Sequence, residues 1–427
     1  MAAAGGLSRD LLDRVAARLP DAPLVVALSG GADSAALARC LLALGRAVRA
    51  VTVDHGLPAS GDLVEGARRV AAELGLDHEV VEVPPASGEG PLRDVRLEAL
   101  EAAARPGEVV ATGHTADDQA ETVLGNLLRG AGAAGLSGIP GSRTGWVRPF
   151  LGVTREEARA AADGLPFVDD PDNVDPDVRR SWLRTRAIPF LEDREGDRVR
   201  PALRRAGGLL AADDALLERR AAAVPVLRRD PFVAVAAAPL TTLPGPVAAR
   251  VARRLLRTAV PPYAGAADDV DGVLQVARSG RSRSVLGRLV SREGGLVVVG
   301  PEATEPPGPA DLGTGIRWGR WTFTVGGDGP GLSRRSALLP ADRRPFRVRA
   351  WAPGDRLDTE IGSKPVAEIL REVGVPARFR PEWPVVDADG TMAWVVGGRL
   401  ATWARPDPTA TTIRITAREA RWTSATS

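Results

Sequence analysis

A short polar segment at residues 29–34, SGGADS, has the residue types and spacing of an anion-binding loop. It follows an apolar run at 24–28 and precedes a helical pattern, so backbone N–H groups and the positive helix end would face the anion. The loop lacks the lysine of a Walker motif and carries Asp33 instead, which would repel a bare phosphate. A Mg²⁺ ion between this carboxylate and the phosphates of a nucleoside triphosphate would remove the conflict. A glycine-rich turn without a ligand is the alternative interpretation.

A second polar segment at 112–122, TGHTADDQAET, places three carboxylates in the first two turns of a predicted helix. Asp117 and Asp118 lie four and three residues before Glu121, so the three are close on the helix surface. Neighbouring carboxylates repel one another and favour a cation, either Mg²⁺ or the ammonium group of a substrate. Acidic residues at a helix start also stabilise the helix dipole, which is the simpler explanation for any one of them. The combination with His114, immediately before the helix, favours a functional site.

Strand and helix patterns alternate from about residue 24 to 150, which predicts a Rossmann-like, doubly wound α/β domain with a mostly parallel sheet. The predicted strands lie at 23–28, 47–54, 78–83 and 108–113, and helices follow from Ser34 and at 63–75, 94–104 and 116–130. Ligands of such domains bind beyond the carboxyl ends of the strands, where both polar segments fall. We therefore expect the two segments to line one cleft.

The rest of the chain predicts two further parts. A helical pattern continues to about Ser279, and strand-like stretches at 294–300 and 320–327 flank a proline-rich segment at 301–313. From about Phe346, strands and one helix alternate in an α+β pattern. We expect a catalytic domain at 1–200, a mainly helical middle domain with a linker at 201–330, and a small α+β domain at 331–427.

Composition excludes several classes of protein. The 427 residues, 44% of them hydrophobic, suffice for several folded domains. No charge-free apolar stretch reaches the roughly 18 residues of a membrane span, and the N-terminal region carries Asp and Arg where a signal peptide is apolar, so we expect a cytoplasmic protein. Cys40 is the single cysteine, which excludes intramolecular disulfides and two-thiol redox chemistry. Arginines interleaved with Trp and Phe suit contacts to phosphates and unpaired bases, although such runs are also common on solvated surfaces.

The strand, SGGxDS loop and helix together resemble the PP-loop of ATP pyrophosphatases, which split ATP between the α and β phosphates. Four segments resemble the tRNA(Ile)-lysidine synthetase family: VDHGL at 53–57, GHTADDQAET at 113–122, AGLSGIP at 134–140 and DNVDPDVRRSWLR at 172–184. GDRL at 354–357 and the segment 364–386 resemble the family's C-terminal tRNA-binding domain. The resemblance implies a ligase that uses ATP to attach free L-lysine to the wobble cytidine of tRNA(Ile) with anticodon CAU. The reaction would proceed through an adenylated cytidine and release AMP and pyrophosphate.

The same resemblance implies roles for individual residues. ATP would be bound by Ser29, Gly30, Gly31, Ala32, Asp33, Ser34, Arg96 and His114, and Mg²⁺ by Asp33 and Asp118. Catalysis would depend on Asp33, His114, Asp118 and Glu121, and the lysine would be held by Asp117, Asp118 and Glu121. The tRNA would be contacted by Arg180, Arg184, Arg371, Arg378 and Arg380, of which the first two would lie near the tRNA or the mouth of the active site. The proton acceptor for the lysine amine stays open between His114 and a nearby carboxylate, and the sequence leaves homodimer formation open.

Two alternatives are weighed against this interpretation. A tRNA thiolase on the same scaffold would need paired cysteines, and this chain has only Cys40. A catalytically silent tRNA-binding protein would not need Ser29, Asp33, His114 and Asp118 together.

Overall fold

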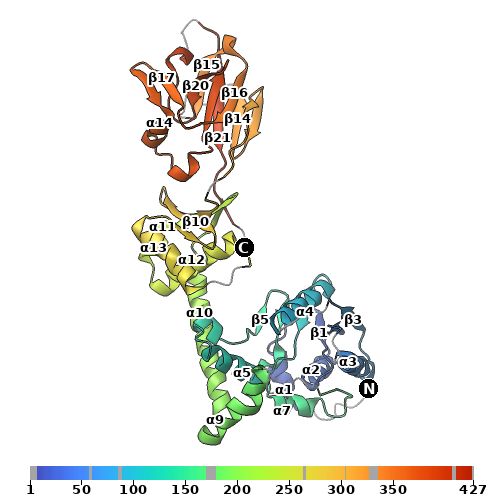
Figure 1. The fold of residues 1–427 in the computed structure, drawn as a ribbon. Coiled ribbons are helices and arrows are strands. Elements are labelled where there is room, and N and C mark those ends of the chain that lie inside the picture. The colour runs from blue at the N-terminus through green and yellow to red at the C-terminus, as the bar shows by residue number, and fades with distance from the viewer. Residues whose placement is uncertain are drawn as a thin grey trace. The chain divides into compact units, whose positions relative to one another are not determined.

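The computed structural model describes residues 7–56, 60–84, 89–169, 179–262, 266–302, 304–326, 335–405 and 410–425 (Figure 1). The chain divides into two compact units, Met1–Leu216 and Leu217–Ser427. Each unit is described by itself below. In the described residues, no helix combines the length and the apolar character that crossing a membrane requires.

A six-stranded sheet with the order β3-β2-β1-β4-β6-β5 forms the centre of the first unit. Its strands are β1 (Leu24–Ala27), β2 (Val48–Asp54), β3 (His78–Glu82), β4 (Val109–Ala111), β5 (Ser142–Arg143) and β6 (Trp146–Val147). All neighbours pair in parallel except β5 and β6, which form an antiparallel edge. The chain order reverses between β1 and β4, which is where open α/β sheets bind their ligands.

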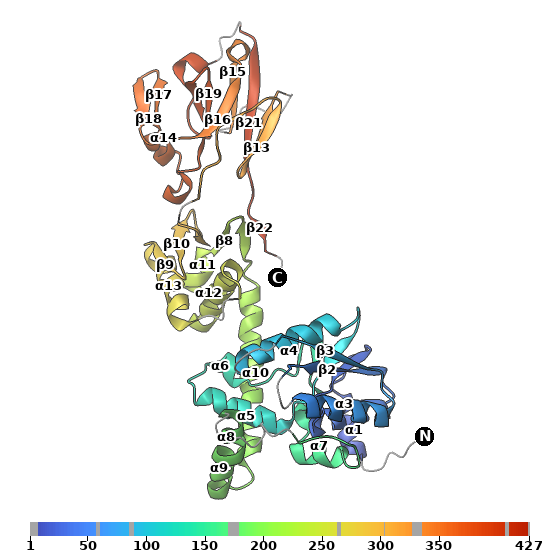
Figure 2. The same cartoon turned by 45° about the vertical axis from the view of Figure 1, so that its right-hand side comes forward.

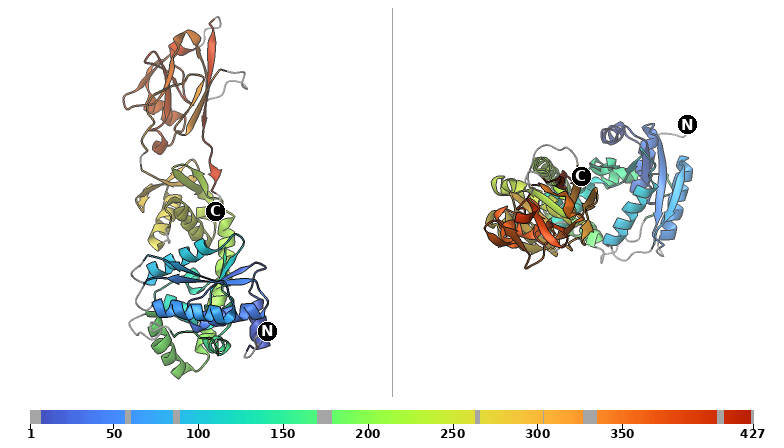
Figure 3. Two further views of the ribbon diagram at one scale, coloured as in Figure 1. Left: turned by 90° about the vertical axis from the view of Figure 1, so that its right-hand side faces the viewer. Right: turned by 90° about the horizontal axis from the view of Figure 1, so that it is seen from above.

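Helices cover both faces of this sheet (Figure 3). They are α1 (Arg9–Ala16), α2 (Ala32–Ala43), α3 (Ser60–Leu74), α4 (Glu89–Ala103), α5 (Ala116–Leu127), α6 (Ala133–Leu136) and α7 (Arg155–Ala161), with a short 3-10 turn η1 (Pro149–Gly152). Figure 2 shows α3 and α4 on opposite sides of β2 and β3. The β1 residues Leu24 and Val26 pack into one core with α2, and Val25 and Ala27 pack into the other core. The doubly wound α/β domain that the sequence predicts is confirmed. Strand β1 is apolar on both faces because helices cover both sides of it.

A second group of helices completes the first unit. It contains α8 (Arg179–Trp182), the π-helical turn η3 (Leu183–Ala187), α9 (Ile188–Glu195) and α10 (Val199–Ala222). Leu124 of α5 packs with Leu183 and Ile188 in a small separate core. The expected border at residue 200 is wrong, because the first compact unit extends to Leu216 along the same continuous helix, α10.

The first half of the second unit combines helices with a sheet. The helices are α11 (Ala237–Thr242), α12 (Gly245–Ala259) and α13 (Ala267–Ser279), and the strands are β7 (Leu227–Arg229), β8 (Phe232–Ala236), β9 (Arg283–Val285), β10 (Arg288–Glu293) and β11 (Leu296–Gly300). Val233 and Val235 of β8 pack with α12, whereas Phe232 and Ala234 join the core of the C-terminal half. The sequence analysis missed β7 and β8 because their alternating apolar residues lie within an Ala- and Leu-rich helical pattern.

Two four-stranded sheets and a hairpin enclose that C-terminal core. Their strands are β12 (Ala310–Asp311), β13 (Gly315–Trp318), β14 (Trp321–Val325), β15 (Ser336–Pro340), β16 (Phe346–Ala350), β17 (Arg356–Thr359), β18 (Gly362–Pro365), β19 (Pro384–Ala388), β20 (Thr391–Val395) and β21 (Thr412–Glu419), and β22 (Thr423–Ser424) pairs with β7. The helical elements are α14 (Val366–Glu372), η4 (Ala341–Arg343), η5 (Ala377–Phe379) and η6 (Thr402–Ala404). The expected border at residue 330 is also wrong, since β13 and β14 precede it and yet share a sheet with β15 and β21.

Candidate active site

The SGGADS segment forms the tight turn between β1 and α2. Gly30 has a φ of +85°, and a Cβ atom there would lie 2.2 Å from the carbonyl oxygen of Leu63, so only glycine fits. The carbonyl oxygen of Gly30 accepts a hydrogen bond of 2.9 Å from the N–H of Val168. Contacts from α3 and from the segment after α7 therefore fix the conformation of the turn.

Hydroxyl groups hold the same turn from inside. Ser34 Oγ accepts from the N–H of Ser29 at 3.1 Å and donates to the carbonyl of Gly31 at 2.9 Å. Gly31 is the N-cap of α2 and has no side chain to bond to the first N–H groups of the helix. These N–H groups face the pocket described below, an arrangement suited to an anion.

The second polar segment forms the turn between β4 and α5. Thr115 is the N-cap of α5, and a capping box joins it to Asp118. Asp118 Oδ2 accepts from the N–H of Thr115 at 2.7 Å, so the sequence fixes the direction of this carboxylate locally. Its other oxygen, Oδ1, points away from the cap.

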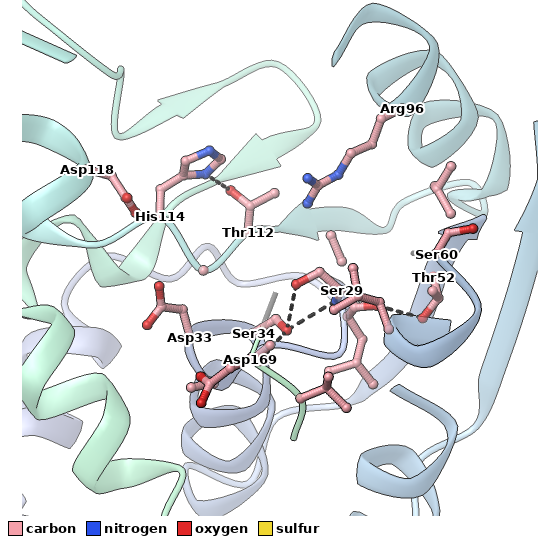
Figure 4. Close-up of a pocket in the computed structure, with 18 of the residues that line it drawn as sticks. Ser29, Asp33, Ser34, Thr52, Ser60, Arg96, Thr112, His114, Asp118 and Asp169 are labelled. Atoms are coloured by element: carbon pink, nitrogen blue, oxygen red, sulfur yellow. Dashed lines mark hydrogen bonds between the residues drawn. The ribbon is translucent and has the colours of Figure 1, made fainter. Parts of the chain in front are cut away.

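One pocket of about 820 Å³ joins the two turns. Asp33, Asp118, His114 and Arg96 all line it, and Figure 4 shows Asp33 and Asp118 directed toward the same space. The expectation of one shared cleft at the carboxyl ends of β1 and β4 is confirmed. His55, at the end of β2, lines the pocket as well.

Three arginines surround the buried carboxylates of α5. Asp118 Oδ1 lies 2.8 Å from Arg155 Nη2, 3.0 Å from Arg180 Nη2 and 3.5 Å from Arg184 Nη2. Glu121 is only 1% exposed and lies 3.1 Å from Arg155 Nη1, 3.2 Å from Arg180 Nε and 2.9 Å from Arg184 Nε. The site therefore compensates its own carboxylates with guanidinium groups.

The two carboxylates of the pocket have opposite pKa shifts. Burial and the nearby Asp118 carboxylate raise the pKa of Asp33 to about 6. Burial also raises the pKa of Asp118, but the guanidinium groups of Arg180 and Arg155 outweigh it and bring this pKa down to about 2. Asp33 lies 4.0 Å from Arg155 Nε, a long contact. Asp33 is therefore the less compensated of the two acids.

His114 is a neutral group in this site. Its Nδ1 lies 2.8 Å from Thr112 Oγ1, and burial, with a further contribution from Arg180, lowers the pKa of the ring to about 3. The ring can donate or accept a hydrogen bond at neutral pH, but it is a weak proton acceptor.

Asp117 does not line the pocket in the part of the chain that the structure describes. Its Oδ2 accepts from the N–H of Arg155 at 2.7 Å, and its Oδ1 accepts from Arg200 Nη1 at 2.9 Å. The predicted lysine-binding role of Asp117 stays a prediction that this geometry does not support, because a residue adjacent to Asp118 on a helix points about 100° away from it.

The sequence analysis missed Arg155, and it placed Arg180 and Arg184 near the tRNA or the mouth of the active site. The structure brings all three arginines to Asp118 and Glu121. A usable signal for Arg155 was the TREE sequence at 154–157, which forms a capping box and places this arginine at the start of α7. Residues 172–178 of the quoted DNVDPDVRRSWLR motif lie outside the described residues.

Asp33 and Asp118 are the two carboxylates of this pocket that the sequence predicts as magnesium ligands. No group of three or more His, Cys, Asp and Glu side chains in the described residues could hold a metal ion by itself. Mg²⁺ commonly binds through one or two carboxylates, waters and substrate phosphates, so Asp33 at the phosphate loop fits it. Asp118 fits less well in this arrangement, because Thr115 and the arginines occupy both of its oxygens.

The arginines predicted to bind tRNA in the second unit differ in environment. Arg371 is exposed on α14. Arg378 instead donates to the carbonyl oxygens of Leu289, Val298, Gly300 and Pro301 and to Ser291 Oγ, at 2.8 to 3.2 Å. Both Nη groups of Arg378 are thus bonded inside the unit, an arrangement that does not support the predicted tRNA contact, and its buried Nε has no hydrogen-bond partner among the described residues. Arg380 donates through Nε to the carbonyl of Val375 at 2.9 Å.

Comparisons with known proteins agree with this geometry. Residues 8–191 match the PP-loop domain family and residues 346–416 match the TilS substrate C-terminal domain family. The tRNA(Ile)-lysidine synthase of Thermus thermophilus is 35% identical over 402 residues, which cover 90% of this chain and 71% of that protein. The enzyme of the same name from Streptomyces coelicolor is 41% identical over 303 residues, which cover 66% of this chain and 86% of the relative.

Proposed function

The chain belongs to the tRNA(Ile)-lysidine synthase family, and we propose that the pocket between β1 and β4 is the place where its reaction occurs. Its activity is the ATP-dependent formation of lysidine on tRNA(Ile). Transfer of adenylate to the cytidine oxygen releases pyrophosphate, and the lysine amine then attacks the activated ring carbon and releases AMP. The observation that carries the placement is the shared pocket of Asp33 and Asp118.

The ATP phosphates would lie at the turn before α2. The N–H groups at the start of α2 have no side-chain cap, and Ser29 and Ser34 line the same wall. Arg96 of α4 points into the pocket from the other side (Figure 4) and would contact a phosphate. These groups would stabilise the negative charge that develops on the phosphate oxygens, and they are already in position to do so.

Mg²⁺ would be held by Asp33 at this turn. The ion would supply positive charge for the phosphate oxygens and the pyrophosphate leaving group. Asp33 is suited to this role because its carboxylate is only partly buried and is weakly compensated. Asp118 would take part only if the arginines on its Oδ1 moved.

Free lysine would be recognised by Asp118 and Glu121. Both carboxylates are bonded to guanidinium groups in this structure, so an ammonium group of lysine would share or displace these contacts. His114 borders the pocket as a neutral ring and would act as a hydrogen-bond partner of the nucleotide or base. The proton acceptor for the lysine amine stays open between His114 and a nearby carboxylate, because the pKa of His114 and that of Asp118 both lie far below neutral pH.

The second unit offers an outward basic surface for tRNA, which we call the β13–β21 face. Strand register aligns Arg317 with Thr322 and Thr322 with Arg418, and all three side chains are exposed. The next residues, Phe323 and Ala417, alternate into the core. Arginine and hydroxyl groups in one row can contact successive backbone phosphates. This face replaces Arg378 as the expected contact, and exposed Arg371 stays a second candidate.

Nucleoside mass analysis tests the proposal directly. The full chain is incubated with ATP, Mg²⁺, isotopically labelled lysine and tRNA(Ile) with anticodon CAU. We expect one labelled lysine in the wobble cytidine, with AMP and pyrophosphate formed in equal amounts. Unmodified cytidine, or pyrophosphate release that does not depend on lysine and tRNA, would contradict it.

The thiolase alternative is not favoured. Cys40, the single cysteine of the sequence, is buried in α2, and burial raises its pKa to about 12. A thiol of that kind is neither a nucleophile at neutral pH nor one of a pair.

A further inference from the structure

Arg155 contacts both buried carboxylates of α5 at once. Its Nη2 lies 2.8 Å from Asp118 Oδ1 and its Nη1 lies 3.1 Å from Glu121 Oε1. Asp118 and Glu121 are three residues apart on one helix face, where two charged carboxylates would otherwise repel. A planar guanidinium that bonds to both, as those of Arg180 and Arg184 also do, holds the two carboxylates at a fixed separation and adds to the support that Thr115 gives Asp118.

Asp117 fixes the other end of the same arginine. Its Oδ2 accepts from the main-chain N–H of Arg155 at 2.7 Å, and its Oδ1 is held by Arg200 at 2.9 Å. Adjacent residues of α5 therefore bind opposite ends of Arg155: Asp117 the main chain, and Asp118 the guanidinium. This explains why an acidic residue that does not line the pocket precedes Asp118.

The start of α7 is held independently. Thr154 caps the helix and forms a capping box with Glu157, and Glu157 is bonded in turn by Arg14 of α1. Arg155 is thus the first helical residue of an anchored turn. Fixed backbone and fixed guanidinium together make Arg155 a rigid support for the two carboxylates.

We propose that Arg155 is a positioning residue that orients Asp118 and Glu121 for the ammonium groups of the lysine substrate, and that Asp117 acts through Arg155. This inference rests on the proposed function, because it needs lysine to be the substrate at these carboxylates. Arg155 lines the pocket as well, and the proposal assigns it the orientation of the carboxylates and no contact with the reacting atoms. Its loss is expected to affect recognition of lysine more than recognition of ATP.

Steady-state kinetics of Arg155→Gln test the first part. We expect the KM for lysine to rise about tenfold or more while the KM for ATP changes less than about threefold. Arg155→Lys keeps the charge but cannot bond to both carboxylates through a fork, so it should recover only part of the lysine affinity. Arg69→Gln is the matched control, since it removes an exposed arginine on α3 that does not line the pocket.

A double-mutant cycle tests the second part. Asp117→Ala should raise the KM for lysine in the same direction, and the double variant with Arg155→Gln should resemble the Arg155→Gln single variant. Strictly additive effects would show that Asp117 does not act through Arg155.

Three outcomes separate the possible failures. Wild-type lysine KM in Arg155→Gln, or equal rises for lysine and ATP, would overturn the positioning role. Absence of lysidine formation by the wild-type chain would instead overturn the proposed function. The melting temperature of each variant shows whether it is folded. If Arg155→Gln is not folded, the KM values for lysine and ATP are compared in Arg155→Lys instead.

Discussion

Gly113 lies against the backbone of Asp33: a Cβ atom on Gly113 would be 2.9 Å from both the carbonyl carbon and the carbonyl oxygen of Asp33. Gly113 follows β4, and Asp33 lies in the first turn of α2. The two polar turns are therefore in backbone contact, and no side chain fits between them. This contact brings Asp33 and Asp118 into one pocket.

Gly113→Ala is expected to push the two turns apart and to lower kcat/KM for ATP by about tenfold to a hundredfold, because small displacements of catalytic groups are costly. Pyrophosphate release with saturating tRNA and lysine measures the effect. Gly208→Ala is the control, since a Cβ atom there meets nothing within 4 Å inside α10. That control should retain activity and gain up to about 1 kcal/mol of stability. Equal activity of the two variants would show that the contact is not needed.

Asp33→Asn is expected to abolish most pyrophosphate release, by about a hundredfold or more, because the magnesium-holding carboxylate is lost. In the absence of ATP and Mg²⁺ the same change should raise the melting temperature, because it removes a partly buried charge facing Asp118. Asp62→Asn, at an exposed position of α3, should change neither quantity. A lower melting temperature of Asp33→Asn, together with lost activity, would contradict the claim that the Asp33 charge destabilises the fold.

Acid should destabilise the chain through His114 as the pH falls below 6.5. The folded pKa of His114 is about 3, below the ordinary value of 6.5, so the unfolded chain binds a proton that the folded chain does not. The stability from this group is complete above pH 6.5 and is lost as the pH falls toward 3. Melting temperatures between pH 8 and pH 4 should fall less steeply for His114→Gln than for wild type. If the melting temperatures of His114→Gln and wild type fall in parallel with pH, the His114 ring is not buried and neutral in the folded chain.

Arg378→Gln is expected to destabilise the second unit, by roughly 2–3 kcal/mol, because several carbonyl oxygens lose their hydrogen-bond donor. Arg371→Gln, exposed on α14, should change stability by less than about 0.5 kcal/mol. Urea denaturation of the full chain, followed by tryptophan fluorescence, measures the difference. Wild-type stability of Arg378→Gln together with weaker tRNA binding would restore the original prediction for this residue.

Arg418→Gln should weaken tRNA binding and reduce the slope of log affinity against log salt by about one, as expected for one lost phosphate contact. Arg317→Gln should act in the same way, because strand register places it in the same row. Binding is measured by filter retention over a series of salt concentrations. Arg9→Gln, exposed on α1, is the control. An unchanged slope for both strand variants would exclude the β13–β21 face.

The local sequence alone determined the framework of the site. The apolar run of β1 and the SGG turn after it, the capping signal at Thr115 and the α/β alternation all depend on neighbours in the chain. Such patterns fix where a strand ends and a helix begins, so the phosphate loop and the carboxylates of α5 were predictable. Strands β11 and β14 were predicted for the same reason.

Only the tertiary structure decided which side chains meet. Asp117 and Asp118 are adjacent in sequence, yet the helix directs one toward Arg200 and the other into the pocket. Arg155 reaches these carboxylates from a different helix, and Arg378 finds its acceptors about eighty residues away. The arginine side chain is long and flexible, so it can bond either to a substrate or to acceptors within the protein. Long-range packing decides which of the two occurs, and local sequence does not encode that packing.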